Sequence, residues 1–172
     1  MIVFPKSQKG FSLLEMLLYV AISSIILLSL SFFLIFLLGS RLKNQSITDV
    51  NQQGIQIMQL ITQTIRNART IDSPSIGATS SSISMTMFDS LVSPTVFDIS
   101  SGTVRIKEGS GVVIPLTNSH VTISSLVFQN ISSTSSTDRI IRISFTIDHN
   151  NPNGRNENVF SKTFTGSATL RQ

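Results

Sequence analysis

The 172-residue chain contains no cysteine. This absence excludes disulfide bonds, thiolate metal sites and thiol chemistry, so packing alone must stabilise the fold. Runs of basic residues interleaved with stacking aromatics are missing too, and the single tyrosine lies inside an apolar segment. A nucleic-acid-binding surface concentrates these residue types. The excess of 13 Lys and Arg over 9 Asp and Glu therefore does not indicate direct nucleic-acid binding.

Motifs for catalysis and metal binding are also missing from the sequence. No G-x-S-x-G, H-E-x-x-H or P-loop occurs, and neither His120 nor His149 has a second histidine at helical spacing. The loop 148–154 is rich in oxygen ligands but does not fit the EF-hand spacing, so a hairpin turn with Asn153 and Gly154 at its tip is preferred over a calcium site. We expect no catalytic residue, no metal and no cofactor.

Charge is nearly absent from residues 11–38, where Glu15 is the single ionisable acidic or basic residue. A helix of this length can cross a hydrocarbon core of about 30 Å. A secretory signal peptide would have a shorter apolar region followed by small residues at a cleavage site, and no such site lies near residues 38–43. We expect a membrane helix that stays with the protein.

No proline lies between Pro5 and Pro74, so the helix can continue beyond the apolar segment. Residues 39–72 are predicted to form an amphipathic helix, and the continuous helix is expected to run from residue 11 to about residue 70. Its apolar positions recur at steps of three and four: Ile47, Val50, Gly54, Ile57, Ile61, Ile65 and Ala68. This stripe either packs on a β-rich head, which we favour, or forms a coiled-coil seam.

The remaining chain, residues 73–172, is predicted to be a β-rich head. Apolar and polar residues alternate strictly over 141–147, as in a half-buried strand. Further strands are expected at 83–88, 95–99, 103–107, 112–116, 121–128 and 158–165, with turns at 101–102, 108–111 and 153–154 and loops at 79–82 and 132–137. The expected fold class is α+β, with one antiparallel sheet burying the helix stripe.

The N-terminal motif is Lys9-Gly10-Phe11-Ser12-Leu13-Leu14-Glu15, which opens directly into the apolar segment. It resembles the precursors of the type IV pilin-like family, which carry a short basic leader, a Gly before the scissile bond, a Phe that becomes N-methylated and a Glu at the fifth mature position. The resemblance implies a leader over 1–10, cleavage by a prepilin peptidase between Gly10 and Phe11, and methylation of Phe11. The chain would be the substrate of that enzyme.

The chemistry of these residues agrees with the resemblance. A carboxylate in a membrane helix is costly unless it has a partner. Cleavage after Gly10 would create an α-amine on Phe11, which can meet Glu15 of a neighbouring subunit and set an axial register. Lys6 and Lys9 would hold the leader in the cytoplasm by the positive-inside rule, which sends the C-terminal head outward. Glu15 snorkelling to water in an ordinary signal anchor is the alternative interpretation.

These observations predict a single-pass protein of the cytoplasmic (inner) membrane with an extracytoplasmic head. We expect a structural, minor subunit of a type IV pilus-like filament or pseudopilus, because the head resembles those of minor pseudopilins in rhythm and the apolar segment lacks the proline of many major subunits. The expected partners are other pilin or pseudopilin subunits, the prepilin peptidase, an assembly platform and the bilayer. A signal-anchored binding protein that does not polymerise is the main rival, and an anchored enzyme is a weaker one.

Overall fold

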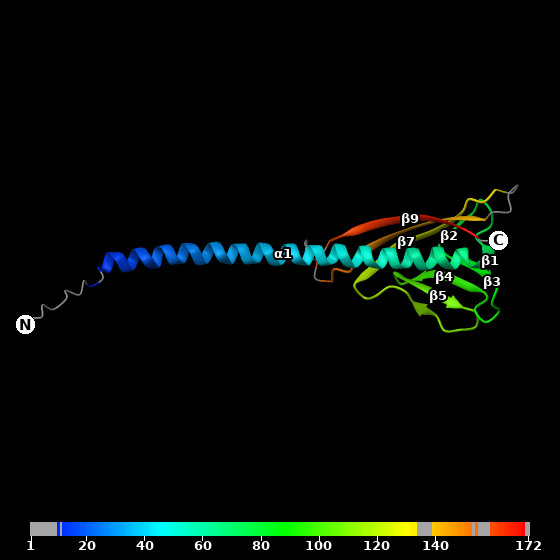
Figure 1. Ribbon diagram of the computed structural model, residues 1–172, viewed down its shortest axis with the longest axis horizontal. Coiled ribbons are helices and arrows are strands. Elements are labelled where there is room, and N and C mark those ends of the chain that lie inside the picture. Colours follow the sequence, from blue (N-terminus) through cyan, green and yellow to red (C-terminus); the bar gives the residue numbers. More distant parts are fainter. Residues whose placement is uncertain (1–9, 11, 134–138, 153, 155–158, 171–172) are drawn as a thin grey trace, which may run out of the picture. The chain divides into compact units, whose positions relative to one another are not determined.

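The computed structural model of the chain describes residues 10, 12–133, 139–152, 154 and 159–170. One long helix is followed by antiparallel strands (Figure 1), which confirms the predicted α+β class. The elements in chain order are α1 (Leu13–Arg66), β1 (Ala68–Ser73), β2 (Thr79–Ser80), β3 (Ile83–Met87), β4 (Thr95–Ser100), β5 (Thr103–Glu108), β6 (Ile114–Pro115), β7 (Val121–Asn130), β8 (Ile140–His149) and β9 (Ser161–Thr169). The chain divides into two compact units, Met1–Arg41 and Leu42–Gln172.

The strands form two sheets, so the expectation of one sheet is wrong. One sheet has the order β1-β3-β4-β5-β6, and the other has the order β2-β7-β8-β9. Every described strand pair is antiparallel. The period-two pattern predicts which side chains face inward, but it does not say which strands are neighbours.

Helix α1 ends at Arg66, four residues before the expected end near residue 70, and β1 begins at Ala68. The amide of Asn67 still donates to the carbonyl oxygens of Gln63 and Thr64, which closes the last turn. Residues 68–73 then pair with β3. The proposed helical segment 39–72 is therefore corrected, because strand pairing determines the conformation of its last five residues.

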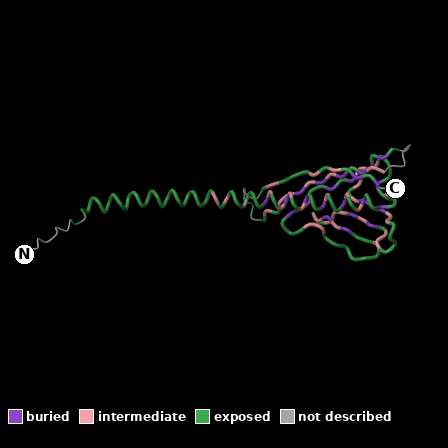
Figure 2. The backbone as a smooth tube through the Cα atoms, in the orientation of Figure 1, coloured by how far each residue is buried: buried purple, intermediate pink, exposed green. Residues whose placement is uncertain are grey.

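The apolar stripe of the second half of α1 is a core face and not an exposed seam. Val50, Ile57, Ile61 and Ile65 are all at most 2 % exposed, while Ile47 is half-buried. These side chains share one hydrophobic cluster with residues of both sheets, including Phe97, Phe128 and Phe145. Within the C-terminal unit, Figure 1 shows α1 with β7 and β9 on one side and β4 and β5 on the other. Figure 2 shows the buried positions recurring along this part of the helix.

Close contacts fix the helix against β9. A Cβ atom added to Gly54 would overlap the ring of Phe164, and one added to Gly166 would lie 2.7 Å from the sulfur of Met58. The ammonium of Lys162 donates to Asn51 Oδ1 at 2.7 Å. Each of the two glycines lets an apolar side chain of the other element approach its backbone, which a larger residue would prevent.

Local features of the strands follow from single residues. Ser101 and Gly102 both have positive φ, as the two central residues of a type I′ hairpin require, and they join β4 to β5. The β7–β8 register shifts between Ile123 and Ser125, which is the effect of a bulge. The bulge lets Ile123 and Leu126 both point into the core although they are three residues apart.

The described parts of the two predicted polar loops take part in strand pairing and in buried hydrogen bonds. Thr79 and Ser80, expected in a loop, form the short strand β2. Buried Asn130 donates from Nδ2 to the Pro74 carbonyl at 2.8 Å, and its Oδ1 accepts from the backbone and the hydroxyl of buried Ser132. Gly154 has a φ of 62°, consistent with a turn, whereas Asn153 and residues 134–137 of the other expected loop lie outside the described residues.

Candidate processing and assembly site

The start of α1 places the N-terminal motif at a helix terminus. Ser12 precedes the first helical residue, Leu13, and its carbonyl oxygen accepts from the amides of Glu15 at 3.0 Å and Met16 at 3.2 Å. Ser12 is therefore the N-cap and Glu15 the third helical residue, which is the spacing of a capping box. A carboxylate at this position is stabilised by the partial positive charge of the helix N-terminus.

Gly10 lies in exposed, non-helical chain before this cap. No heavy atom would come within 4 Å of a Cβ atom added at Gly10. The backbone at Gly10 is thus open to an enzyme, because it is neither inside the helix nor covered by other described residues.

Glu15 is exposed in the first turn of α1. The hydroxyl of Tyr19, one turn along the helix, donates to Glu15 Oε1 at 3.4 Å. This distance exceeds the usual O–H···O distance of about 2.7–2.8 Å, so Tyr19 gives weak compensation. The carboxylate keeps capacity for a stronger partner.

The apolar part of α1 has no protein around it within the described residues. Leu13 is 80 % exposed and Phe36 is 73 % exposed. By length and composition, α1 is the one helix among the described residues that could cross a membrane, and none of its most apolar window is buried. An exposed apolar helix of this length and composition is typical of a membrane-spanning segment.

Four serines, Ser23, Ser24, Ser29 and Ser31, interrupt the apolar surface, and the hydroxyls of Ser23, Ser24 and Ser31 have partners inside the helix. Ser23 and Ser24 donate to the Val20 carbonyl at 3.0 and 2.7 Å, and Ser31 donates to the Leu27 carbonyl at 2.8 Å. Bonds of this kind satisfy a hydroxyl where no water is available. Glu15 remains the side chain of this segment with the greatest need for an external partner.

The structure thus describes two of the five residues predicted for the site, Gly10 and Glu15, and places them at the same helix end. Lys6, Lys9 and Phe11 lie outside the described residues. Sequence reasoning missed Ser12 and Tyr19. The S-x-x-E spacing would have identified the cap, and the i,i+4 spacing of Glu15 and Tyr19 would have identified their contact.

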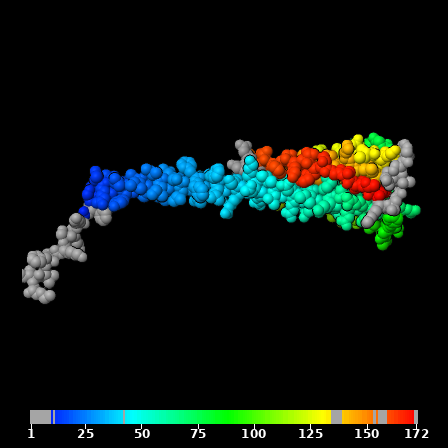
Figure 3. Space-filling view, turned by 45° about the horizontal axis from the view of Figure 1, so that its top comes forward, coloured from blue at the N-terminus to red at the C-terminus, as the bar shows by residue number. Residues whose placement is uncertain are grey.

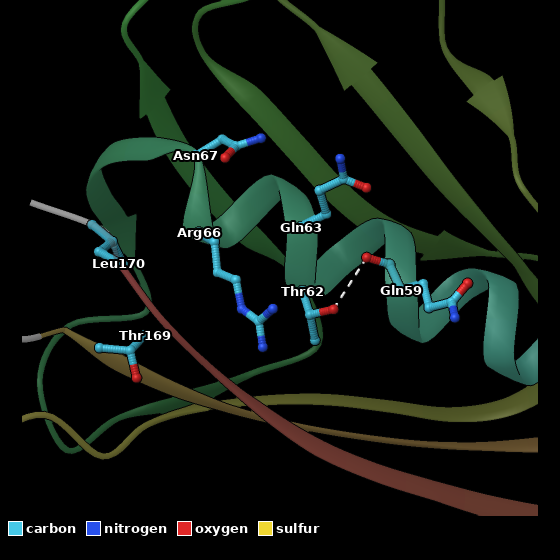
Figure 4. A pocket seen from close by; sticks show the side chains of 7 residues that line it. All are labelled: Gln59, Thr62, Gln63, Arg66, Asn67, Thr169 and Leu170. Carbon is cyan, nitrogen blue, oxygen red and sulfur yellow. Dashed lines mark hydrogen bonds between the residues drawn. The ribbon is translucent and has the colours of Figure 1, made fainter.

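A groove in the C-terminal unit is a second feature with binding potential. It has a volume of about 810 Å³ and lies between the last turns of α1 and the end of β9 (Figure 4). Its lining is mostly amide and hydroxyl groups, with one cation and one apolar side chain: Gln59, Thr62, Gln63, Arg66, Asn67, Thr169 and Leu170. This lining is suited to hydrogen bonding.

A metal centre has no support in the part of the chain that the structure describes. No group of three or more His, Cys, Asp or Glu side chains there could hold a metal ion. The histidine of the predicted 148–154 turn, His149, instead lies beside α1, with Nε2 at 3.9 Å from Asp49 Oδ2.

Comparison with known proteins identifies the N-terminal segment. Residues 5–31 match the prokaryotic N-terminal methylation motif. The match includes Gly10, Phe11, Glu15 and Tyr19, and it ends before the second half of α1 begins. No curated protein and no solved structure matches the chain. The motif is a structural one and not an enzyme class, and it supports the predicted resemblance of the N-terminal segment to type IV pilin-like proteins.

Proposed function

We propose that the chain is a minor structural subunit of a type IV pilus-like filament or pseudopilus, which serves secretion, DNA uptake or pilus biogenesis. In this proposal a prepilin peptidase cuts after Gly10 and methylates Phe11, and the N-terminal helices of neighbouring subunits then pack together. The expected partners are sibling subunits, the peptidase, an inner-membrane assembly platform and the bilayer.

The observation that carries this proposal is the position of Glu15. It is an exposed carboxylate in the first turn of a helix whose next 23 residues, 16–38, contain no Asp, Glu, Lys or Arg. An ionised side chain inside a bilayer costs a few kcal/mol on insertion scales, and such residues usually pair with another charge. The Phe11 α-amine, created by cleavage four residues away, supplies a cation that a neighbouring subunit shifted along the helix axis can bring level with Glu15.

The same arrangement explains why assembly would follow processing. Before cleavage, Phe11 contributes a neutral amide, and Glu15 accepts a weak hydrogen bond from the Tyr19 hydroxyl. After cleavage, an amine from one subunit and a carboxylate from the next compensate each other in a medium where both are poorly solvated. Peptidase action would thereby control entry into the filament.

The orientation follows from the flanking charges. Lys6 and Lys9 on the leader side favour a cytoplasmic N-terminus, and the C-terminal unit would then be extracytoplasmic. The absence of proline from residues 6–73 supports a minor rather than a major subunit, by resemblance to the family.

The proposal is tested with Glu15→Gln, which removes the charge and keeps the side-chain size. The full chain is co-expressed with a prepilin peptidase and a filament assembly system. We expect the variant to insert, to be cleaved and to start at methylated Phe11, but to be lost from the sheared filament fraction. The matched control is Glu108→Gln, an exposed acid at the end of β5, which should assemble normally.

Two results would contradict the proposal. Recovery of chains that still begin at Met1 in the presence of active peptidase would exclude processing. Normal assembly of Glu15→Gln would exclude the charge pair. Absence of the unaltered chain from the filament fraction would favour the rival function, a signal-anchored binding protein that does not polymerise.

A further inference from the structure

Three of the four sheet edges in the described part of the chain are protected from pairing with another chain. β2 and β6 have two residues each, and β6 contains Pro115. β1 has two register irregularities and is followed by Pro74. Short strands, bulges and prolines all prevent a foreign strand from extending a sheet.

The fourth edge, β9, has none of these protections. It has nine residues and no proline, and it pairs with β8 through nine successive residue pairs without a register shift. Its only neighbour among the described strands is β8. Lys162 is its one charged residue. An edge of this length and regularity is a template for one more strand.

The open hydrogen-bonding groups of β9 follow from the strand register. The Leu170 amide donates to the Arg139 carbonyl at 3.0 Å, so the backbone groups of Leu170 point toward β8. Because these groups alternate in an antiparallel strand, those of alternate residues of β9 point away from β8. The residues concerned are Ser161, Thr163, Thr165, Ser167 and Thr169, and all five are exposed. Figure 3 shows the β9 segment at the surface of the C-terminal unit, beside the second half of α1.

Basic side chains surround this edge. Lys162 lies near its start, Arg142 is exposed on β8 opposite Ser167, and Arg66 lines the groove at its end. In Figure 4 the Arg66 side chain extends from α1 toward the β9 chain. The Arg66 guanidinium has no hydrogen bond or ion pair with another described residue. The acidic residue of β8 that lies opposite β9 in the strand register is Asp148, across from Ser161.

We propose that the β9 edge binds an extended, acidic segment of another protein, which adds a strand to the four-stranded sheet and places a carboxylate beside Arg66. Backbone donors and acceptors at a two-residue spacing match an extended peptide, and the basic side chains select an acidic one. A second copy of this chain fits less well, because its own β9 offers Lys162 and no acid. The groove gives the end of the peptide a polar site of about 810 Å³.

The proposal is tested on the full-length, unprocessed chain in detergent micelles, so the result does not depend on cleavage or filament assembly. The probes are three peptides of nine residues, the length of β9. All alternate Thr and Val: one has Glu at both ends, one has Lys at both ends, and one has Glu ends and a central Pro. Amide hydrogen exchange over residues 161–169 and fluorescence anisotropy report strand addition and affinity.

We expect the peptide with Glu ends to slow exchange at Thr163, Thr165 and Ser167 by at least about tenfold and to bind at least about tenfold more tightly than the peptide with Lys ends. The proline peptide should not bind. Slow exchange of the outward amides in the free chain would overturn the proposal, as would equal binding of all three peptides. Slow exchange that depends on protein concentration would make a second copy the occupant and would also overturn it.

Two variants locate the binding. Thr165→Pro removes an amide that points away from β8 and should abolish binding, since proline is tolerated on an edge strand. If amide exchange in β7 and β8 shows that this variant is unfolded, the proposal is tested with Arg66→Gln instead. It should remove most of the preference for Glu over Lys ends, whereas the matched variant Arg69→Gln, on β1 of the other sheet, should keep it. Unchanged preference in Arg66→Gln contradicts the assignment.

Discussion

The ring of Phe164 occupies the space that a Cβ atom on Gly54 would need, and the same ring stacks on Phe145 with centroids 5.5 Å apart. The Lys162 ammonium lies 5.1 Å from the centroid of the Phe164 ring. One aromatic side chain of β9 therefore joins α1, β8 and β9, and its position depends on a glycine in the helix.

Replacing this glycine tests the relationship. Gly54→Ala should destabilise the C-terminal unit by about 1–3 kcal/mol, because the half-exposed Phe164 ring must leave its position over the helix. The better helix propensity of alanine offsets at most about 1 kcal/mol of this loss. Urea-dependent proteolysis of the full chain in micelles measures the change. In a Phe164→Ala background the same substitution should be neutral or stabilising, and equal effects in both backgrounds would show that the ring is not the cause.

Asn130 gives a second test, of the polar end of the sheet. Asn130→Ala removes the partners of the Pro74 carbonyl and of Ser132, and leaving a buried polar group unpaired costs about 1–3 kcal/mol per group. The expected loss of stability is therefore about 2–4 kcal/mol. Gln129→Ala, at the neighbouring half-buried position, is the control and should cost much less. A similar loss in both variants would mean that trimming this strand, and not the Asn130 network, matters.

How far the sequence predicts this fold is clearest along α1. Steps of three and four residues identify Ile57, Ile61 and Ile65 as core positions, because a helix face is determined by local spacing alone. The end of the helix at Arg66 is not marked by glycine or proline. Residues 68–73 become β1 because β3 is available for pairing, and that information lies outside the segment.

The same distinction holds for the strands and for the candidate site. The alternation in 141–147 predicts β8, whereas the two-residue strand β2 depends on pairing with Gln129 and Phe128. For the site, the spacings of Gly10, Ser12, Glu15 and Tyr19 are visible in the sequence, but the 3.4 Å distance that makes the Tyr19 contact weak comes from the structure. Local patterns predict elements and motifs, and non-local contacts determine the edges and the two-sheet arrangement.

The core assignment of the helix stripe predicts unequal effects at adjacent residues. Ile61 is fully buried, whereas Leu60 is 37 % exposed. Ile61→Ala should cost about 2–5 kcal/mol of stability because it leaves a cavity, and Leu60→Ala should cost about 1 kcal/mol or less because much of its surface already meets solvent. Protease resistance of the C-terminal unit against urea gives both values. Equal losses would favour the rejected coiled-coil interpretation.

A substitution at Tyr19 distinguishes between the two partners available to Glu15, which are the Tyr19 hydroxyl and the Phe11 α-amine of a neighbouring subunit. Tyr19→Phe removes the hydroxyl that donates to Glu15 and keeps the ring. Side-chain hydrogen bonds within membranes contribute about 0.6 kcal/mol on average, so filament yield should change by less than about threefold. Loss of assembly as complete as that expected for Glu15→Gln would indicate that Tyr19, and not the Phe11 amine, is the essential partner.

Replacing Gly10 with a larger residue should block cleavage without disturbing the fold. No described residue would lie within 4 Å of a Cβ atom at Gly10, so Gly10→Leu should leave α1 and the stability of the C-terminal unit unchanged. The peptidase must approach the backbone closely, and a branched side chain at this position should obstruct it. Mass spectrometry of the membrane fraction should therefore find the intact chain, and the filament fraction should contain none of it although Glu15 is unchanged. Ser7→Leu, in the same leader but away from the junction, is the control and should be cleaved normally. If uncleaved Gly10→Leu chains enter filaments at the wild-type level, the new α-amine is not needed for assembly, and the charge pair with Glu15 cannot be what joins the subunits.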